Sequence, residues 1–110
     1  MAKINYSIAA LEDLIGIGDY IAEELKSPPS ALNTVNMIQD TIDNLIDFPL
    51  MGVPLSSVVN MDTDYKFLVC GNYLAFYRTN DDIVFIDRIL YGRRDYINIL
   101  FNDLQQNDTI

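Results

Sequence analysis

The chain has 110 residues, half of them hydrophobic and 11% aromatic, which is enough material for one compact domain and argues against disorder. Sixteen acids outnumber seven lysines and arginines, for a net charge of −9. That balance argues against general binding to nucleic acid or membrane surfaces, because phosphate contacts depend on lysine and arginine. No apolar run approaches the roughly 20 residues that span a bilayer, and the N-terminus lacks the apolar stretch of a signal peptide. We therefore expect a soluble cytoplasmic protein, folded as one domain over residues 1–110 with a flexible tail from about residue 103.

Two residue types that are scarce or missing limit the chemistry. The chain has no histidine and one cysteine, Cys70, which excludes Ser-His and Cys-His nucleophile pairs, imidazole ligands and multi-thiolate metal sites. Cys70 lies in the apolar run YKFLVCG, which favours an inert core thiol over a reactive one. Any catalysis must use carboxylate, lysine, arginine, tyrosine or the nucleic acid itself, and we expect neither a metal nor a cofactor.

The first half of the chain predicts a strand followed by two helices. Residues 2–6 form a short strand in this prediction, and Ser7 is a suitable N-cap for the helix that follows. After the break KSPPSA, apolar residues step by four and three along a second helix over residues 30–47. The short connection predicts an antiparallel helix pair. Gly16 and Gly18 weaken the first helix and suggest that another backbone approaches it closely.

The second half predicts a loop, three strands and a last helix. Residues 48–64 contain prolines and a glycine and resemble a loop; two strands then flank the two-residue turn Gly71-Asn72. A further strand over residues 83–90 precedes a helix over residues 93–104. The order β-α-α-β-β-β-α predicts an α+β domain, in which a helix hairpin packs on a small, antiparallel-rich, four-stranded sheet.

The positions of the two turns predict which side chains share a face of this sheet. With a second turn at residues 80–81, Lys66, Tyr73, Tyr77 and Arg88 lie on one face. The other face is more aromatic, and it also carries Arg78 and Asp87. We expect the aromatic face to meet the helices and the face with Lys66 to be the open surface.

The stretch RILYGRRDY, residues 88–96, holds three of the four arginines. Arg93 and Arg94 fall at the start of the predicted last helix, where a cation costs about 0.3–1 kcal/mol because a helix N-terminus is itself positive. A phosphate or carboxylate partner would reverse that cost. The alternative is that Asp87, Asp95 or an acid of the helices neutralises these arginines.

The ordered set of these motifs resembles the RelE/ParE family, the toxic partners of bacterial type II toxin-antitoxin pairs. The glycine-turn hairpin, the strand YLAFYR, the ending RILYGRRDY and the upstream FPLMGVPL all match, and the resemblance covers residues 2–101. It implies a sheet that cradles a cationic concave surface beside a helix hairpin. It also implies growth inhibition, a role in plasmid stabilisation, and an antitoxin whose helical or extended tail wraps the toxin. Assembly as a homodimer or a toxin–antitoxin hetero-oligomer is compatible with it.

Two activities divide that family. RelE-like members cut mRNA in the ribosomal A site, whereas ParE-like members inhibit DNA gyrase. By resemblance, Lys66 matches a catalytic lysine of the ribonucleases, and Arg94, with Arg93 beside it, matches the arginine that follows the last strand. In a ribonuclease, Lys66 would act as base or charge stabiliser and Arg94 as the clamp on the transition state. Either activity requires these cations to converge on one solvent-filled hollow of the sheet.

Three departures from the ribonuclease pattern favour the ParE-like branch. Leu74 occupies the place of an arginine, Leu68 the place of a second lysine, and Leu100 the place of a catalytic tyrosine. We therefore expect a toxin that binds a target such as DNA gyrase and is neutralised by a cognate antitoxin. The alternatives are an mRNA interferase acting on the ribosome and its mRNA, and an attenuated relative that is not toxic. Six residues are the candidates for binding the target or the antitoxin: Tyr73, Tyr77, Arg88, Tyr91, Arg93 and Arg94.

Overall fold

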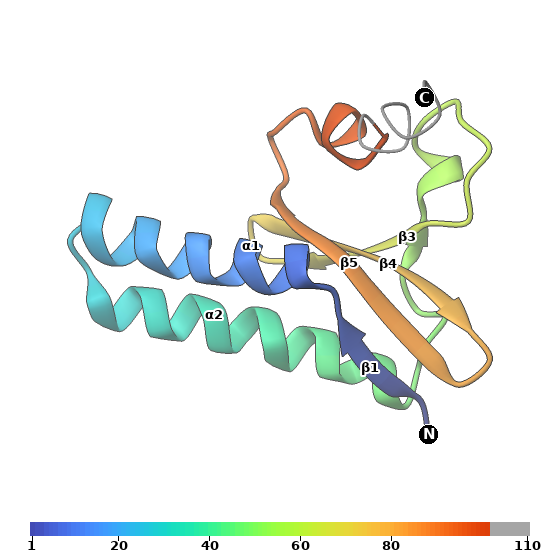
Figure 1. Cartoon of the computed structure of the whole chain (residues 1–110), viewed down its shortest axis with the longest axis horizontal. Coiled ribbons are helices and arrows are strands. Elements are labelled where there is room, and N and C mark those ends of the chain that lie inside the picture. The colour runs from blue at the N-terminus through green and yellow to red at the C-terminus, as the bar shows by residue number, and fades with distance from the viewer. Residues whose placement is uncertain (102–110) are drawn as a thin grey trace.

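A pair of helices covers one face of a five-stranded sheet in the computed structural model, which describes residues 1–101 (Figure 1). The strand order is β1-β5-β4-β3-β2. β1 runs parallel to β5, and every other neighbouring pair is antiparallel. A short helical segment over residues 96–101 follows the sheet. The flexible tail expected from residue 103 lies outside the described residues.

The elements follow the expected order, with one strand more than predicted. They are β1 (Lys3–Tyr6), α1 (Ile8–Asp19), the π-helical turn η1 (Tyr20–Glu24), α2 (Pro28–Asp43), the 3-10 turn η2 (Asn44–Ile46), β2 (Val53–Pro54), the 3-10 turn η3 (Leu55–Ser57), β3 (Lys66–Cys70), β4 (Tyr73–Asn80) and β5 (Ile83–Tyr91). The additional strand, β2, has two residues within the segment expected to be a loop. The α+β class and the helix hairpin are as predicted.

The helix starts follow local sequence signals. The Ser7 hydroxyl accepts a hydrogen bond from the backbone N–H of Ala10 at 2.9 Å, which confirms the predicted N-cap. α2 begins at Pro28, since proline is tolerated in the first helical turn. A close approach of another backbone at the α1 glycines is not found. A Cβ on Gly16 would meet nothing within 4 Å, and one on Gly18 would lie 3.4 Å from the Val35 side chain.

The turn between β3 and β4 lies at the residues predicted for it, whereas the turn between β4 and β5 does not. Gly71 has a φ of 62° in the turn between β3 and β4, and Cys70 pairs with Tyr73 as expected. The second turn is one residue later than predicted, so that Asn80 pairs with Ile83. Its first residue, Asp81, has a φ of 54°, a left-handed conformation that aspartate tolerates. A β-bulge then shifts the register of β4 and β5 between Phe76 and Tyr77. Arg88 therefore pairs with Phe76 and does not share a face with Tyr73 and Tyr77 as predicted.

The prediction of which sheet face is open was also wrong. The face with Leu68, Ala75, Tyr77 and Ile86 packs against α1 and α2 and forms the main core. The more aromatic face packs instead against η3 and the segment after β5. The residues of this second cluster are Leu55, Tyr65, Phe76, Leu90 and Leu100. Aromatic content was a poor guide because both faces are covered, each by a different part of the chain.

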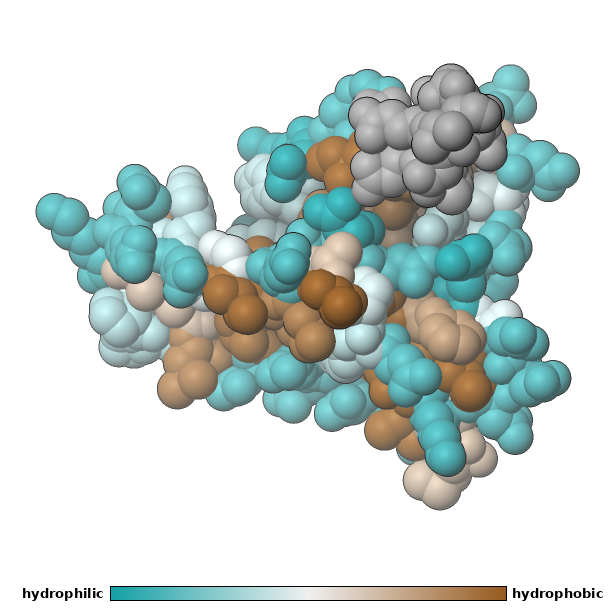
Figure 2. Space-filling model, viewed as in Figure 1, coloured by the Kyte–Doolittle hydropathy of each residue, from teal (hydrophilic) through white to brown (hydrophobic). Residues whose placement is uncertain are grey.

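The outer surface of the helix pair keeps apolar groups exposed. Figure 2 shows apolar surface over the region of α1 and α2. On α1 the exposed fractions are 76% for Ile8, 46% for Leu11 and 63% for Ile15. These three residues follow helical spacing, so they form one stripe on α1 that the rest of the described chain does not cover.

Tyr77 anchors the loop before β2 to the sheet. The side chain is fully buried, and its hydroxyl accepts a hydrogen bond from the backbone N–H of Gly52 at 2.9 Å. A Cβ on Gly52 would lie 2.5 Å from that hydroxyl oxygen and 2.9 Å from the carbonyl oxygen of Phe67. The glycine is therefore required by close packing against Tyr77.

Replacing Gly52 with alanine should loosen this contact. We expect Gly52→Ala to lower the free energy of unfolding by about 1–3 kcal/mol, because overpacking must displace Tyr77 or the loop. Gly16→Ala is the matched control, since its new methyl group meets open space, and it should raise stability by about 0.5–1 kcal/mol. Urea denaturation of the three proteins measures both changes. Equal midpoints for Gly52→Ala and wild type would contradict the packing argument.

The Cys70 thiol should be unreactive while the protein is folded. Cys70 is fully buried, and burial raises the pKa of its thiol from 9.0 to about 11. A thiol reagent at neutral pH should therefore label Cys70 only at the rate of unfolding. Because the folded-state pKa is raised, the thiol's contribution to stability is complete below pH 9.0 and is lost as the pH rises through about 11. Rapid labelling of the native protein would disprove the burial of this thiol.

Candidate functional site

The open edge of β5 is completed by side chains from the start of α1. β1 accompanies β5 only as far as Ile86, whose carbonyl accepts a hydrogen bond from the Ser7 backbone N–H at 2.9 Å. The Ser7 hydroxyl then donates to the Asp87 carbonyl at 2.7 Å. Further along, the Ile89 backbone N–H donates to Asp13 Oδ2 at 2.9 Å. α1 therefore stands at the sheet edge and replaces the strand that ends there.

Asp13 also holds Arg88 in a two-point ion pair. Arg88 Nε lies 2.8 Å from Asp13 Oδ2, and its Nη2 lies 2.9 Å from Asp13 Oδ1. The side chains keep only 25% and 13% of their surface exposed. Such paired geometry is among the stronger ionic contacts in proteins. Arg88 is therefore engaged in holding α1 to β5.

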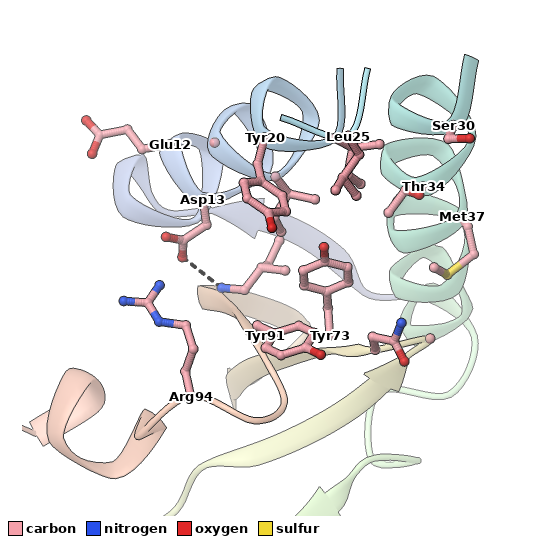
Figure 3. Close-up of a pocket in the computed structure, with 16 residues that line it drawn as sticks. Glu12, Asp13, Tyr20, Leu25, Ser30, Thr34, Met37, Tyr73, Tyr91 and Arg94 are labelled. Atoms are coloured by element: carbon pink, nitrogen blue, oxygen red, sulfur yellow. Dashed lines mark hydrogen bonds between the residues drawn. The ribbon is translucent and has the colours of Figure 1, made fainter. Parts of the chain in front are cut away.

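A cleft of about 960 Å³ opens beside this ion pair (Figure 3). Its walls come from α1, η1 and α2 on one side and from the turn at Gly71 and the end of β5 on the other. Three tyrosines, Tyr20, Tyr73 and Tyr91, line it together with Asp13 and Arg94. The cleft therefore gathers three of the six candidate binding residues, namely Tyr73, Tyr91 and Arg94.

The three tyrosines lie close together. The rings of Tyr73 and Tyr91 meet edge to face, with centroids 5.8 Å apart and an angle of 68°. Burial raises the pKa of Tyr73 above 10.0, and the neighbouring phenol groups of Tyr91 and Tyr20 raise it further. Tyr20 and Tyr91 remain exposed, at 55% and 38%. The cleft is thus aromatic, accessible to solvent and rich in phenol oxygens.

Arg93 and Arg94 precede the last helix instead of starting it. They lie in the turn after β5, where the Arg94 N–H donates to the Tyr91 carbonyl at 3.0 Å, and helical structure begins only at residue 96. Both side chains are exposed. Neither forms an ion pair with an acid among residues 1–101. These two guanidinium groups remain available to a partner, although the helix position predicted for them was wrong.

The expected convergence of the cations is not found. Lys66 begins β3 and pairs with Pro54 and Tyr77, at the opposite end of β3 from the turn at Gly71. The cleft that Arg94 lines does not include Lys66. Tyr77, another candidate, lies in the core, where a partner cannot reach it in this conformation. The six candidate residues therefore lie in different parts of the fold. Three of them, Tyr73, Tyr91 and Arg94, line the same cleft, which we call the tyrosine cleft.

The other sheet face carries a second ion pair between two residues of this chain, in which Arg78 is exposed. Arg78 Nε lies 3.0 Å from Asp87 Oδ2, which also accepts the Tyr65 hydroxyl at 2.8 Å. The Arg78 guanidinium stands 5.1 Å from the centre of the Tyr65 ring. Burial and the Asp87 contact raise the pKa of Tyr65 to about 12. As the sequence predicted, Arg78 and Asp87 share the aromatic face, and Asp87 neutralises Arg78 there.

Sequence reasoning missed two residues that shape the cleft. Asp13 is one acid among many on the helices, and nothing in its spacing marks it as the partner of β5. Tyr20 follows an ordinary helical stretch, and the π-helical turn that begins at it has no recognised signature in the sequence. The role of Asp13 depends on its contacts with Arg88 and Ile89, which a single sequence does not display.

Among residues 1–101, no group of three or more histidine, cysteine, aspartate or glutamate side chains is arranged to hold a metal ion. Within the same residues, no helix has the length and apolar character needed to cross a membrane.

Removing the Asp13 carboxylate should destabilise the fold. Asp13→Ala leaves the Ile89 N–H and the half-buried Arg88 guanidinium without their acceptor, and we expect a loss of about 2–3 kcal/mol in the free energy of unfolding. Glu12→Ala, which removes the neighbouring exposed carboxylate, should change stability by less than about 0.5 kcal/mol. Chemical denaturation of both variants measures these two changes in the free energy of unfolding. A similar small effect for the two substitutions would show that Asp13 does not hold α1 to the sheet.

Comparisons with known proteins agree with the fold and place the chain in a family. The structure resembles the chromosomal ParDE TA system from P. aeruginosa, with a TM-score of 0.69 and 22% sequence identity over 83% of this chain and 96% of that chain. A second similar structure is YafQ from E. coli strain BL21(DE3), with a TM-score of 0.44 and 14% identity over 83% of this chain and 93% of that chain. No curated protein matches the sequence. The family model described as the ParE toxin of the type II toxin-antitoxin system parDE matches residues 4–96. This match spans most of the 110 residues, so the chain belongs to the ParE toxin family of type II toxin-antitoxin systems.

Proposed function

We propose that this ParE-family toxin inhibits growth by binding a protein target such as DNA gyrase, and that a cognate antitoxin neutralises it. The observation that carries the proposal is the distribution of the cations. Arg78 and Arg88 are each paired with an acid of the same chain. Arg94 lines the tyrosine cleft, and Lys66 does not. This arrangement supports a binding surface in preference to a catalytic centre.

Ribonuclease chemistry would need a different arrangement. A chain without histidine must stabilise a phosphoryl transition state with several converging cations or with a metal ion. The tyrosine cleft offers one arginine, Arg94, and two acids, Glu12 and Asp13. The net charge of −9 also opposes docking against ribosomal RNA. The mRNA interferase is therefore the less supported alternative.

Several exposed side chains support protein binding. The α1 stripe of Ile8, Leu11 and Ile15 is the kind of apolar surface that marks interfaces (Figure 2). At the cleft, Tyr91 and Arg94 are exposed, and tyrosine and arginine are enriched among residues that dominate binding energy. We propose that the target or the antitoxin contacts Tyr73, Tyr91, Arg93 and Arg94.

The antitoxin should be the more basic partner in this pair. Residues 1–63 hold nine acids and two lysines, a net charge of −7, and the remaining residues hold seven acids and five cations, a net charge of −2. Asp40, Asp43 and Asp47 are exposed near the end of the second helix. An excess of negative charge on the helix side favours a partner of opposite charge. The resulting assembly would be a toxin–antitoxin hetero-oligomer.

Induction without an antitoxin tests the proposed function. Growth, mRNA integrity and plasmid supercoiling are followed together in the same cultures. We expect growth arrest and altered supercoiling while translated mRNA stays intact. Arg94→Ala should weaken the arrest because it removes an exposed binding group, and Lys66→Ala should leave the arrest unchanged.

Three other outcomes would each count against this proposal. Codon-specific cuts in mRNA that disappear in Lys66→Ala would identify an mRNA interferase. Continued growth with abundant folded protein would identify an attenuated relative that is not toxic. Purified protein that leaves gyrase supercoiling untouched, at concentrations that arrest growth, would exclude gyrase as the target.

A further inference from the structure

An irregular helical turn places one of the cleft tyrosines. α1 gives way at Tyr20 to the π-helical turn η1, in which the Leu25 N–H donates to the Tyr20 carbonyl at 3.3 Å. π turns are rare in proteins and are frequent at functional sites, because the extra residue in the turn redirects side chains. Ile21, the next residue, is buried with 7% exposed. Tyr20 itself points into the cleft toward Tyr73 (Figure 3).

The three cleft tyrosines come from three separate elements and retain unused polar groups. Tyr20 belongs to η1, Tyr73 begins β4, and Tyr91 ends β5. Within residues 1–101, none of their hydroxyls makes a hydrogen bond, whereas those of Tyr65 and Tyr77 do. Tyr20 and Tyr91 are exposed and Tyr73 is half-buried, so part of the surface of these cleft-lining side chains is accessible to a ligand. Such a cluster offers π-faces and phenol oxygens, which together attract a cation.

The charges around the cleft favour the same kind of ligand. Glu12 lines the cleft, is exposed and has no ion-pair partner among residues 1–101. The exposed acids Asp19, Glu23 and Glu24 and the exposed Lys26 lie near Tyr20 in the sequence, and none of these four lines the cleft. Arg94 is the opposing charge at the cleft, and it is not stacked on any of the three rings, since the cation–π contact found in the described chain joins Arg78 to Tyr65. Among the charged residues that line the cleft, Asp13 is paired with Arg88, so Glu12 supplies the available negative charge that would attract a cation.

We infer that the tyrosine cleft binds a cationic side chain, arginine or lysine, presented by a segment of the toxin's protein partner. The inference rests on the proposed function, because it assigns a chemistry to the partner that a binding toxin requires. The charged end would lie among Tyr20, Tyr73 and Tyr91. Its aliphatic stem would pack on Ile17 and Leu25, which also line the cleft. The site would thus select a basic partner segment over a neutral one of the same shape.

A pair of synthetic peptides tests the inference directly. The peptides are acetyl-Ala-Leu-X-Leu-Ala-amide with X as arginine or as citrulline, which keeps the shape of arginine without its charge. They are titrated into the full-length toxin while NMR signals of the tyrosine rings are recorded. We expect the arginine peptide to bind about fivefold or more tightly than the citrulline peptide. The signals of Tyr20, Tyr73 and Tyr91 should move, and that of Tyr65 on the other sheet face should not.

Substitutions complete the test. Tyr20→Leu should abolish the preference for arginine, and Tyr91→Leu should do the same if Tyr20→Leu fails to fold. Phe48→Leu is the matched control, because Phe48 is also exposed, at 65%, and does not line the cleft; it should keep the full preference. Equal affinity for the two peptides, the absence of saturable binding up to the solubility limit, or shifts centred outside the cleft would overturn the inference.

Failure of the inference can be separated from failure of the proposed function. Growth arrest by a toxin whose cleft shows no preference for arginine would overturn the cation site and leave the toxin function in place. A cleft that prefers the arginine peptide, in a chain that causes no growth arrest, would support the cation site and overturn the proposed toxin function. In that case the cleft would still recognise a basic segment, and the toxic activity would be lost.

Discussion

One structural requirement determines where α1 stands: the backbone of β5 must find hydrogen-bond partners beyond the point where β1 ends. A backbone N–H or carbonyl left unpaired in a half-buried position is costly. β1 stops at Tyr6, and β5 continues to Tyr91. Ser7 and Asp13 supply the next two hydrogen bonds along that edge. The first helix is therefore held to the sheet by polar contacts in addition to its buried apolar residues.

This attachment has direct consequences for the functional site. Asp13 engages Arg88, so one of the three clustered arginines becomes part of the scaffold. The turn after β5 then carries Arg93 and Arg94 away from the ion pair, with Arg94 on the wall of the cleft. The same geometry brings Tyr20 on η1 opposite Tyr73 and Tyr91. The cleft is thus a product of how α1 meets the edge of β5, and its lining is aromatic, with Glu12 and Arg94 as its charged groups outside the ion pair.

Much of this fold could be predicted from local signals. The Ser7 cap, the proline at the start of α2 and the glycine turn at Gly71 each have a backbone cause that one sequence displays. The family resemblance was also visible in the sequence, and the match over residues 4–96 confirms its ParE-like branch. Arg94, Tyr73 and Tyr91 were predicted as binding candidates, and all three line one cleft. Their common location is compatible with that prediction, which awaits a binding experiment.

The failures share a physical origin in long-range contacts. The second hairpin turn was misplaced by one residue, which moves the pairing of β4 with β5 by two residues and leaves the faces unchanged. The β-bulge is what exchanges the faces of the later β5 residues, so that Ile89 joins the main core in the place predicted for Arg88. The bulge in β5 and the two-residue strand β2 each depend on pairing with a neighbouring strand, and the π-helical turn at Tyr20 has no recognised sequence signature. Lys66 was expected near the arginines because the predicted register placed it on one sheet face with Arg88, and because the family resemblance implied a shared cationic surface. In the fold, the length of β3 separates Lys66 from the turn beside the cleft.

The attachment of α1 to β5 is tested most directly by hydrogen exchange at the Ile89 backbone amide. If Asp13 accepts this hydrogen bond, the amide in the native protein should exchange as slowly as the amides paired between β4 and β5. In Asp13→Ala its exchange should accelerate more than that of the paired amides. An Ile89 amide that exchanges in the wild-type protein as fast as those of exposed loops would contradict the account, because α1 would then have no polar attachment to the edge of the sheet.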